Sequence, residues 1–334
     1  MHPKQWLAIK KEGLYCIPGD FFIDPVLPVK QAIITHAHSD HARAGHEHVF
    51  AHTHTIDLMA IRYDEGFASK FRRLAYHERV RVKDVEWYLL PAGHILGSSQ
   101  VVIEYKGSRL IISGDYKRSL DPTCDPFVVE PCDVFITEAT FGLPIFKHPP
   151  IEKEINKLLV SIKAFPHRCH LVGVYGLGKC QRLIRTLRLM GYLDPIFIHG
   201  ALKKLCDFYE SMKIDLGELR IASTLDADNS QGKIVLCPPS ALRDRWSRRF
   251  ANVVVSMASG WMQTRARAKQ QGVELPLVIS DHADWFELIQ TIKEINPQEV
   301  WITHGQEEAL VHYLNQQGYK AQALHLLGYE EHED

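Results

Sequence analysis

The segment 35–41 constrains this chain more than any other part of its sequence. It reads Thr-His-Ala-His-Ser-Asp-His and directly follows the apolar run 32–34, which predicts a strand. Because alternate side chains of an extended chain share a face, His36 and His38 are expected to point the same way. The aspartate and the third histidine then come after a turn. Imidazole and carboxylate groups suit zinc, manganese or iron, so the segment predicts a metal site at the end of a strand.

Histidine is also unusually frequent in the chain as a whole. There are 19 histidines in 334 residues, and seven of them lie between His36 and His54. A chance cluster on the surface is the alternative, but the spacing within segment 35–41 argues against it for the first three. The four that lie outside the motif are expected to be structural or incidental: His46, His48, His52 and His54.

The composition is that of an ordinary globular protein with material for a large core. With 46% hydrophobic and 24% charged residues over this length, roughly two domains are expected. The seven cysteines never occur in Cys-x-x-Cys spacing, which favours reduced thiols. The first residues lack the apolar stretch of a signal peptide, and no apolar run approaches the roughly 18 residues of a membrane helix. We therefore expect a cytoplasmic protein without a membrane partner.

The local patterns divide the chain into three sections. The first 140 residues alternate as short strands, interrupted by one predicted helix near 55–64. After residue 150, helices and strands alternate, which is typical of a sheet covered by helices. The last section has predicted strands at 277–280 and 300–303 and predicted helices at 285–295 and 307–317.

Three further polar residues follow predicted strands, in an order that carries information. Asp24 follows a short apolar run, His94 ends Pro-Ala-Gly-His after the next full strand, and Asp115 ends Ser-Gly-Asp after another. Together with segment 35–41, this series resembles the metallo-β-lactamase fold, in which successive strand ends supply metal ligands. The resemblance implies an α/β (α+β) protein built as an αββα sandwich.

Downstream segments resemble the β-CASP nucleases, which hydrolyse phosphodiester bonds in DNA or RNA. Thr-Glu-Ala-Thr-Phe-Gly at 137–142 resembles their motif A, Ser-Asp-His-Ala-Asp-Trp at 280–285 motif B, and Thr-His-Gly at 303–305 motif C. The resemblance implies a discontinuous division of the chain: residues 1–144 and 276–334 would form the metallo-β-lactamase domain, and residues 145–275 an inserted β-CASP cap.

The same resemblance implies which residues hold metal. Two divalent ions are expected, Zn²⁺ first and Mn²⁺ as the alternative, and a hydroxide activated by both would attack the phosphodiester. The implied ligands are His36, His38 and His94 for one ion, Asp40, His41 and His304 for the other, and Asp115 between the two. Asp24 would orient the metal loop without binding metal.

The implied catalytic residues are Asp40, Asp115, His282 and Glu138. His282 would be the general acid that protonates the leaving sugar oxygen, a task suited to a side chain that titrates near neutrality. Glu138 would orient His282 through a hydrogen bond.

Other segments resemble particular branches of the family, but they do not decide whether the substrate is DNA or RNA. Tyr-Gly-Leu-Gly-Lys at 175–179 and Ser-Gly-Trp at 259–261 resemble elements of Artemis-like crosslink-repair nucleases. His304 in motif C, by contrast, is typical of RNA-processing β-CASP enzymes. Pro-Ala-Gly-His-Ile-Leu-Gly-Ser-Ser-Gln, Ser-Gly-Asp-Tyr-Lys-Arg and Ser-Gly-Trp-Met look most like the bacterial ligase-associated DNA exonucleases.

That last resemblance implies a metal-dependent exodeoxyribonuclease of DNA repair. It would act on single-stranded or frayed ends, from the 5′ end by analogy, beside an ATP-dependent DNA ligase and a helicase. The main alternative is a β-CASP ribonuclease that processes RNA 3′ ends as an endonuclease. A hydrolase of small esters or thioesters is a third reading, although such an enzyme does not need a cap that binds a polyanion.

The near-neutral net charge of -1 conceals an uneven distribution. Residues 145–275 hold 21 Lys and Arg against 11 Asp and Glu, whereas the rest of the chain holds 18 against 29. A basic insert is where a phosphate backbone is expected to bind, although a solvated basic face with Trp246 in a core is the plainer reading. The candidate nucleic-acid contacts are Gly178, Lys179, Arg243, Arg245, Trp246, Arg248, Ser259 and Trp261.

Overall fold

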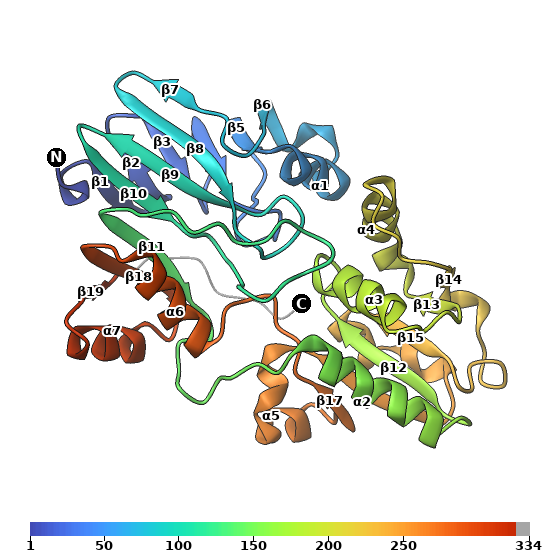
Figure 1. Ribbon diagram of the computed structural model, residues 1–334. Coiled ribbons are helices and arrows are strands. Elements are labelled where there is room, and N and C mark those ends of the chain that lie inside the picture. The colour runs from blue at the N-terminus through green and yellow to red at the C-terminus, as the bar shows by residue number, and fades with distance from the viewer. Residues whose placement is uncertain (325–334) are drawn as a thin grey trace. The chain divides into compact units, whose positions relative to one another are not determined.

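The computed structural model describes residues 1–324, which divide into two units. The first unit comprises Met1–Lys147 with residues 282–324, and the second comprises His148–Asp281 (Figure 1). Each unit has its own sheets and helices, so the two are described separately.

Two sheets form the centre of the first unit. One has the strand order β1 (Leu7–Lys10), β2 (Gly13–Cys16), β3 (Phe21–Ile23), β4 (Gln31–Ile34), β5 (His46–His52) and β6 (Ala68–Leu74). The other has the order β19 (Lys320–Ala323), β18 (Glu299–Gly305), β11 (Val134–Ala139), β10 (Ser108–Ile112), β9 (Ser99–Tyr105), β8 (Val85–Pro91) and β7 (Val80–Val82). The pairs β3–β4, β10–β11 and β11–β18 are parallel, so within each sheet the carboxyl ends of these strands meet at one edge.

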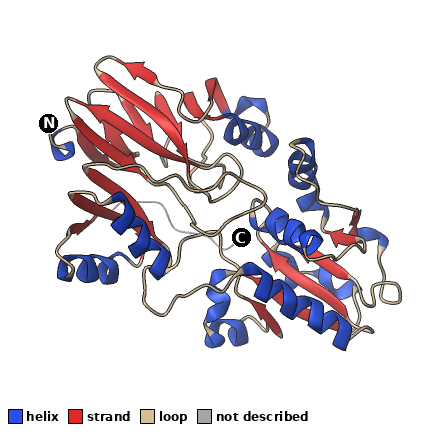
Figure 2. Ribbon diagram, in the orientation of Figure 1, coloured by secondary structure: helices blue, strands red, loops and turns tan. Residues whose placement is uncertain are grey.

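The two-residue period of the strands explains how these sheets are layered. Ile33 and Leu89 turn into the core between the two sheets, whereas their neighbours Ile34 and Leu90 turn outward. Helix α1 (Thr53–Tyr63) packs on the outer face of the first sheet. Helices α6 (Trp285–Ile295) and α7 (Glu307–Gln316) pack on the outer face of the second (Figure 2). The result is a helix–sheet–sheet–helix sandwich, in agreement with the predicted α+β class.

The second unit is built on a wholly parallel sheet. Its strand order is β14 (Leu219–Ile221), β13 (Ile196–Ile198), β15 (Ile234–Cys237), β12 (Cys169–Val174), β16 (Val253–Ala258) and β17 (Leu275–Leu277). Its helices are α2 (Ile151–Ala164), α3 (Lys179–Leu189), α4 (Gly200–Ser211) and α5 (Arg265–Gln270). Every residue of β12 is buried, as expected of a parallel strand that is covered on both faces. That this unit is a β-CASP cap stays a prediction.

Some strands differ from the sequence-based expectation. The strand predicted at 277–280 lies earlier, at Leu275–Leu277, where it pairs with β16. Beyond it, the Val278 N–H donates to the Glu154 carboxylate at 2.9 Å, so the chain leaves the sheet. Strands β5 and β6 were not predicted, because β6 is a mostly exposed edge strand without apolar alternation and β5 is rich in histidine.

The thiols behave as the cysteine pattern predicts. No disulfide bond is found in the part of the chain that the structure describes. Burial raises the pKa of Cys16, Cys169 and Cys237 to about 12, so these thiols stay protonated and unreactive at neutral pH. Within residues 1–324, none of the helices is both long and apolar enough to span a membrane.

His52 gives the first unit a predictable loss of stability in acid. Its buried ring stacks on Tyr76 at 4.1 Å, and burial, together with the nearby His54, lowers its pKa from 6.5 to about 4. Between about pH 4 and pH 6.5, His52 is therefore protonated in the unfolded chain but neutral in the folded chain. The stability from neutral His52 is complete above about pH 6.5 and is lost between there and pH 4, at about 1.4 kcal/mol per pH unit.

His52→Asn isolates this effect. The wild-type ring accepts a hydrogen bond from the His54 N–H at the start of α1, and asparagine is also a strong residue for that position. Urea unfolding between pH 7 and pH 4 should show a shallower loss of stability for the variant, whatever its stability at pH 7. Parallel pH dependence of the two proteins would contradict the assignment.

Candidate metal centre

The loop 35–41 leaves β4 and is held by Asp24, which follows β3. The Asp24 carboxylate accepts hydrogen bonds from Thr35 N–H at 2.7 Å and from Thr35 Oγ1 at 2.6 Å. Its Oδ2 also pairs with His41 Nδ1 at 2.8 Å, which directs the other ring nitrogen of His41 away from Asp24. These contacts join Asp24 to both ends of segment 35–41, and its role in orienting the loop stays a prediction.

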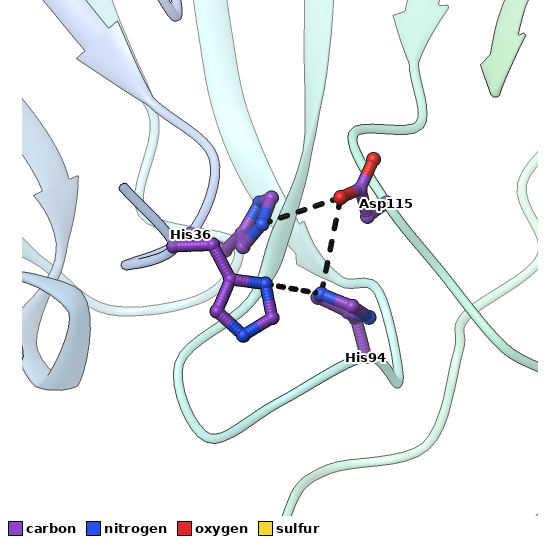
Figure 3. Close-up of side chains that lie close together, drawn as sticks. His36, His94 and Asp115 are labelled. Atoms are coloured by element: carbon purple, nitrogen blue, oxygen red, sulfur yellow. Dashed lines mark hydrogen bonds and ion pairs between the residues drawn. The ribbon is translucent and has the colours of Figure 1, made fainter. Parts of the chain in front are cut away.

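Asp115, which follows β10, lies at the centre of a ring of histidines. Its Oδ2 is 3.4 Å from His36 Nε2, 3.4 Å from His41 Nε2 and 3.9 Å from His94 Nε2. Its Oδ1 is 3.7 Å from His304 Nδ1. Figure 3 shows His36 and His94 both pointing toward Asp115. One carboxylate is thus shared by side chains from several separate loops.

The ligand-type atoms form three overlapping groups, each with its atoms within 4.8 Å of one another. The groups are His36, His38, His94 and Asp115; His41, Asp115 and His304; and Asp115, Glu138 and His282. Asp40, predicted as a ligand beside His41, belongs to none of these groups, but its Oδ2 lies 3.6 Å from His41 Nε2.

Glu138 and His282 are directly paired. His282 Nδ1 lies 3.0 Å from Glu138 Oε2 and 3.1 Å from Oε1, and both side chains are buried. The backbone N–H of Tyr116 also donates to Glu138 Oε1, at 2.7 Å. The carboxylate is therefore fixed from one side while it holds the imidazole on the other.

Irregular backbone brings these loops together. The register of β11 and β18 shifts between Thr137 and Ala139, so that Thr303 and His304 of β18 lie opposite the single residue Glu138. Such a bulge re-aims side chains, and His304 adopts a φ of 58° there. Gly114 has a φ of 55°, and a Cβ on it would lie 2.9 Å from the Thr35 Cβ. Only glycine allows Asp115 to approach the metal loop so closely.

The charges of the cluster suit metal binding. Burial and the neighbouring His41 lower the pKa of His36 well below its usual value. Burial acts the same way on His41, but the carboxylates of Asp115 and Asp40 outweigh it and hold the pKa of His41 well above the usual value. Burial would raise the pKa of Asp115, yet His41 and His36 hold it well below its usual range. Asp115 is thus an anion and His36 a neutral imidazole, the states that metal coordination requires, whereas His41 would have to release a proton to bind metal.

The residues fit divalent metal ions on structural grounds as well. His36 Nε2 is buried, makes no hydrogen bond and faces Asp115 Oδ2. A buried ring nitrogen in that position calls for a partner that the protein alone does not supply. The donor set of imidazole nitrogens around a shared carboxylate is one that zinc and manganese accept.

The predicted nucleic-acid contacts, all in the second unit, fall into two classes. Arg243, Arg245 and Arg248 are exposed, on or beside the short 3₁₀ helix Arg245–Arg249. Trp246 is half-buried, with its ring 4.6 Å from that of His199 and packed against the core of the unit.

The remaining candidates are less accessible or are engaged within the unit. Lys179 is buried, with Nζ 3.8 Å from Asp281 Oδ2 and 4.7 Å from the Tyr175 ring. The Gly178 N–H, at the start of α3, donates to Gln181 Oε1. Ser259 is buried and caps the turn at Trp261, whose partly exposed ring lies 4.2 Å from the Arg267 guanidinium.

Two residues that shape the site lie within segments quoted from the sequence, but were assigned no role there. Thr35 joins Asp24 to the metal loop, and its Oγ1 also lies 3.1 Å from His36 Nδ1. Lys117 is buried beneath the loop that carries His94. Both act largely through main-chain atoms or neighbours of the motifs, which a residue pattern does not reveal.

The chain is similar in sequence to known proteins over much of its length, although no protein-family profile matches it. A protein of Opitutus terrae named "Probable DNA ligase" is 28% identical over 326 residues, which are 96% of this chain and 31% of that protein. "Endoribonuclease YSH1" of Candida glabrata is 32% identical over 297 residues, which are 71% of this chain and 38% of that protein. "Cleavage and polyadenylation specificity factor subunit 3" of Dictyostelium discoideum is 24% identical over 289 residues, 71% of this chain and 37% of that protein.

The chain is also similar in fold to solved structures. A protein of unknown function from Enterococcus faecalis V583 matches with a TM-score of 0.60 and 13% identity, over 89% of this chain and 80% of that one. Together, the relatives indicate the metallo-β-lactamase/β-CASP nuclease family and imply a metallo-β-lactamase fold. The chain spans well under half the length of the three named relatives.

Proposed function

We propose that this protein is a metal-dependent nuclease that hydrolyses phosphodiester bonds, and that it degrades DNA from an end. The observation that carries the proposal is the Glu138–His282 pair. Asp115 lies next to this pair and also next to the histidine cluster. A metal centre beside an oriented imidazole suits phosphodiester hydrolysis, because metal ions can supply the nucleophile and the imidazole can give a proton to the leaving alkoxide.

The residues of the chain divide between two metal positions. His36, His38 and His94 would hold one ion, and His41, His304 and Asp40 the other, with Asp115 shared. When bound, such ions would activate a water molecule as nucleophile and neutralise charge on the phosphate. Asp24 and Thr35 would keep the loop rigid, since their hydrogen bonds fix both ends of segment 35–41.

His282 would act as the general acid. Glu138 as a carboxylate only accepts hydrogen bonds, so His282 donates to it from Nδ1. The proton for the leaving sugar oxygen then comes from Nε2, the other ring nitrogen. Tyr116 N–H fixes Glu138 and thereby the orientation of the imidazole.

The choice of DNA rests on two supports. A relative that matches 96% of the chain is named "Probable DNA ligase", and this chain accounts for only 31% of it. An end-trimming nuclease joined to a ligase would prepare ends for sealing, so a ligase is the partner we propose, with a helicase as a further one. The exposed Arg243, Arg245 and Arg248 of the second unit, proposed as a β-CASP cap, would bind the phosphate backbone.

RNA cleavage is the second candidate, and two observations favour it. The Candida glabrata relative is named an endoribonuclease. His304, the type of residue that is typical of RNA-processing β-CASP enzymes at motif C, lies 3.7 Å from Asp115. An internal cut in RNA, rather than stepwise loss from an end of DNA, would mark this activity.

End-labelled single-stranded DNA and matched RNA, each with Zn²⁺ or Mn²⁺, separate these functions. Stepwise shortening of DNA, and slower or no loss of RNA, is the result we expect, and labels at the 5′ and 3′ ends give the polarity. Internal cleavage of RNA at a higher rate would support the ribonuclease instead. Intact DNA and RNA, with metal bound to the protein, would refute both.

A further inference from the structure

A buried lysine lies beneath the loop that carries His94. Lys117 is 1% exposed, and its Nζ donates to the main-chain carbonyls of Gly93 and His94, both at 2.6 Å. The third contact is an ion pair with Asp121 Oδ2 at 2.7 Å, whose side chain is 4% exposed. These contacts use the three N–H donors of the ammonium group.

The loop that Lys117 contacts is a tight turn that begins with a flexible residue. Gly93 has a φ of 74°, a conformation that glycine adopts without strain. The turn is closed on its other side by Ser98, whose Oγ accepts the His94 N–H at 3.1 Å and whose carbonyl accepts the Ala92 N–H. Lys117 is the charged donor to both carbonyls, and the Gly93 carbonyl also accepts from Cys124 Sγ at 3.5 Å. Loss of the ammonium group would weaken the hold on this turn and let rotation about Gly93 shift the His94 ring relative to Asp115.

Lys117 also stands at the end of a segment that touches the other parts of the site. Asp115 contacts the histidines, and Tyr116 donates its N–H to Glu138 and accepts at its carbonyl from the Ala283 N–H at 2.6 Å. Three consecutive residues thus connect the shared carboxylate, the Glu138–His282 pair and the His94 loop.

We propose that Lys117 is a positioning residue for the metal centre: its ammonium group fixes the Gly93–His94 carbonyls and so sets the distance between His94 and Asp115. The inference rests on the proposed function, because it assigns His94 to metal. It predicts that loss of Lys117 weakens metal binding at the position of His36, His38 and His94 by about 10- to 100-fold, as loss of outer partners of metal ligands typically does.

The plainer alternative is that Lys117 and Asp121 are merely a buried ion pair. Removing one partner of such a pair destabilises a protein, because it leaves an uncompensated charge, whereas removing both charges is often tolerated. Asp121 Oδ1 also accepts from the N–H and hydroxyl of Thr123, so Asp121→Asn would keep a hydrogen-bonded side chain there. The two roles therefore predict different behaviour for the double variant.

The experiment compares Lys117→Met with Lys117→Met/Asp121→Asn. Zn²⁺ affinity is measured by competition with a chromophoric chelator, and thermal unfolding of the metal-free proteins is measured in parallel. Arg118→Met is the matched control, because Arg118 is the next residue but donates to Thr291 and Glu294 of α6. We expect the control to bind Zn²⁺ as the wild type does.

The expected result is that the double variant regains thermal stability but still binds one Zn²⁺ equivalent about tenfold or more weakly. This comparison holds even where Lys117→Met alone does not fold. Recovery of wild-type Zn²⁺ affinity together with stability would overturn the proposal and leave an ion pair only. A wild-type protein that binds no Zn²⁺ or Mn²⁺ would instead refute the metal-dependent function, so the two failures are distinguishable.

Discussion

Asp115→Asn is expected to abolish nearly all cleavage of phosphodiester bonds by this protein. Asp115 is the carboxylate that both histidine groups share, with His36 and His41 each 3.4 Å from its Oδ2. An amide has almost the same shape but no charge, so four imidazoles would face a neutral group. Metal-based stabilisation is worth several kcal/mol, so we expect the rate to fall at least about a thousandfold.

Asp57→Asn is the matched control for this prediction. Asp57 lies on α1, where it pairs with the exposed Arg73 at 2.9 Å, and the substitution removes the same charge at a surface position. Cleavage by this variant should equal that of the wild type. Rates are measured on labelled single-stranded DNA at saturating Zn²⁺ or Mn²⁺, with metal content determined for each protein. An Asp115→Asn variant within tenfold of wild-type activity would contradict the shared-ligand scheme.

The resemblance to the metallo-β-lactamase fold implied that the motifs gather in space, and the strand order of the structure gives a physical reason for it. Asp24 and segment 35–41 follow the parallel pair β3 and β4, and Asp115 and Glu138 lie at the ends of the parallel pair β10 and β11. Polar residues that follow parallel neighbours must lie at one edge of a sheet. The order of the strands is therefore enough to bring these polar residues to one edge of each sheet, without any information on side-chain contacts.

Residues that act on the main chain were assigned no role from the sequence, even where a quoted segment contains them, as Ser-Gly-Asp-Tyr-Lys-Arg contains Lys117. Lys117 is one of 39 Lys and Arg residues, and its partners are the carbonyls of Gly93 and His94, groups that every residue carries. Likewise Arg182 and Arg188 show helical spacing in a basic segment, yet Arg182 donates to the Ser280 carbonyl and Arg188 to four carbonyls, including that of Leu216. A charge count does not distinguish these from the exposed arginines.

The many histidines of the chain likewise differ in role, and only some of these roles could be predicted from the sequence. His36, His38 and His41 face the shared carboxylate or its group, as their spacing predicts. His46, however, accepts the Val29 N–H, and His52 caps α1. At these two positions the imidazole is a buried ring that accepts a hydrogen bond from the backbone. Spacing identified the first set because metal coordination needs several ligands at one point, whereas a single structural histidine leaves no pattern.

His282→Ala is expected to slow cleavage of DNA by about 10²- to 10⁴-fold while metal stays bound. His282 is buried against Glu138, and its removal leaves the leaving sugar oxygen without a proton donor. Glu138→Gln should cause a smaller loss, because an amide can still accept from Nδ1 but no longer stabilises a positive ring. His312→Ala is the control, since His312 is an exposed histidine bonded to Gln316 on α7.

The role of the acid is tested by changing the leaving group. A thymidine monophosphate p-nitrophenyl ester releases p-nitrophenolate, which departs without a proton, so His282→Ala should slow its hydrolysis far less than it slows cleavage of DNA. Asp115→Asn, by contrast, should slow both reactions, because activation of the nucleophile is needed in each. If His282→Ala reduced hydrolysis of the ester and of DNA by the same factor, His282 would be maintaining the metal centre rather than donating a proton.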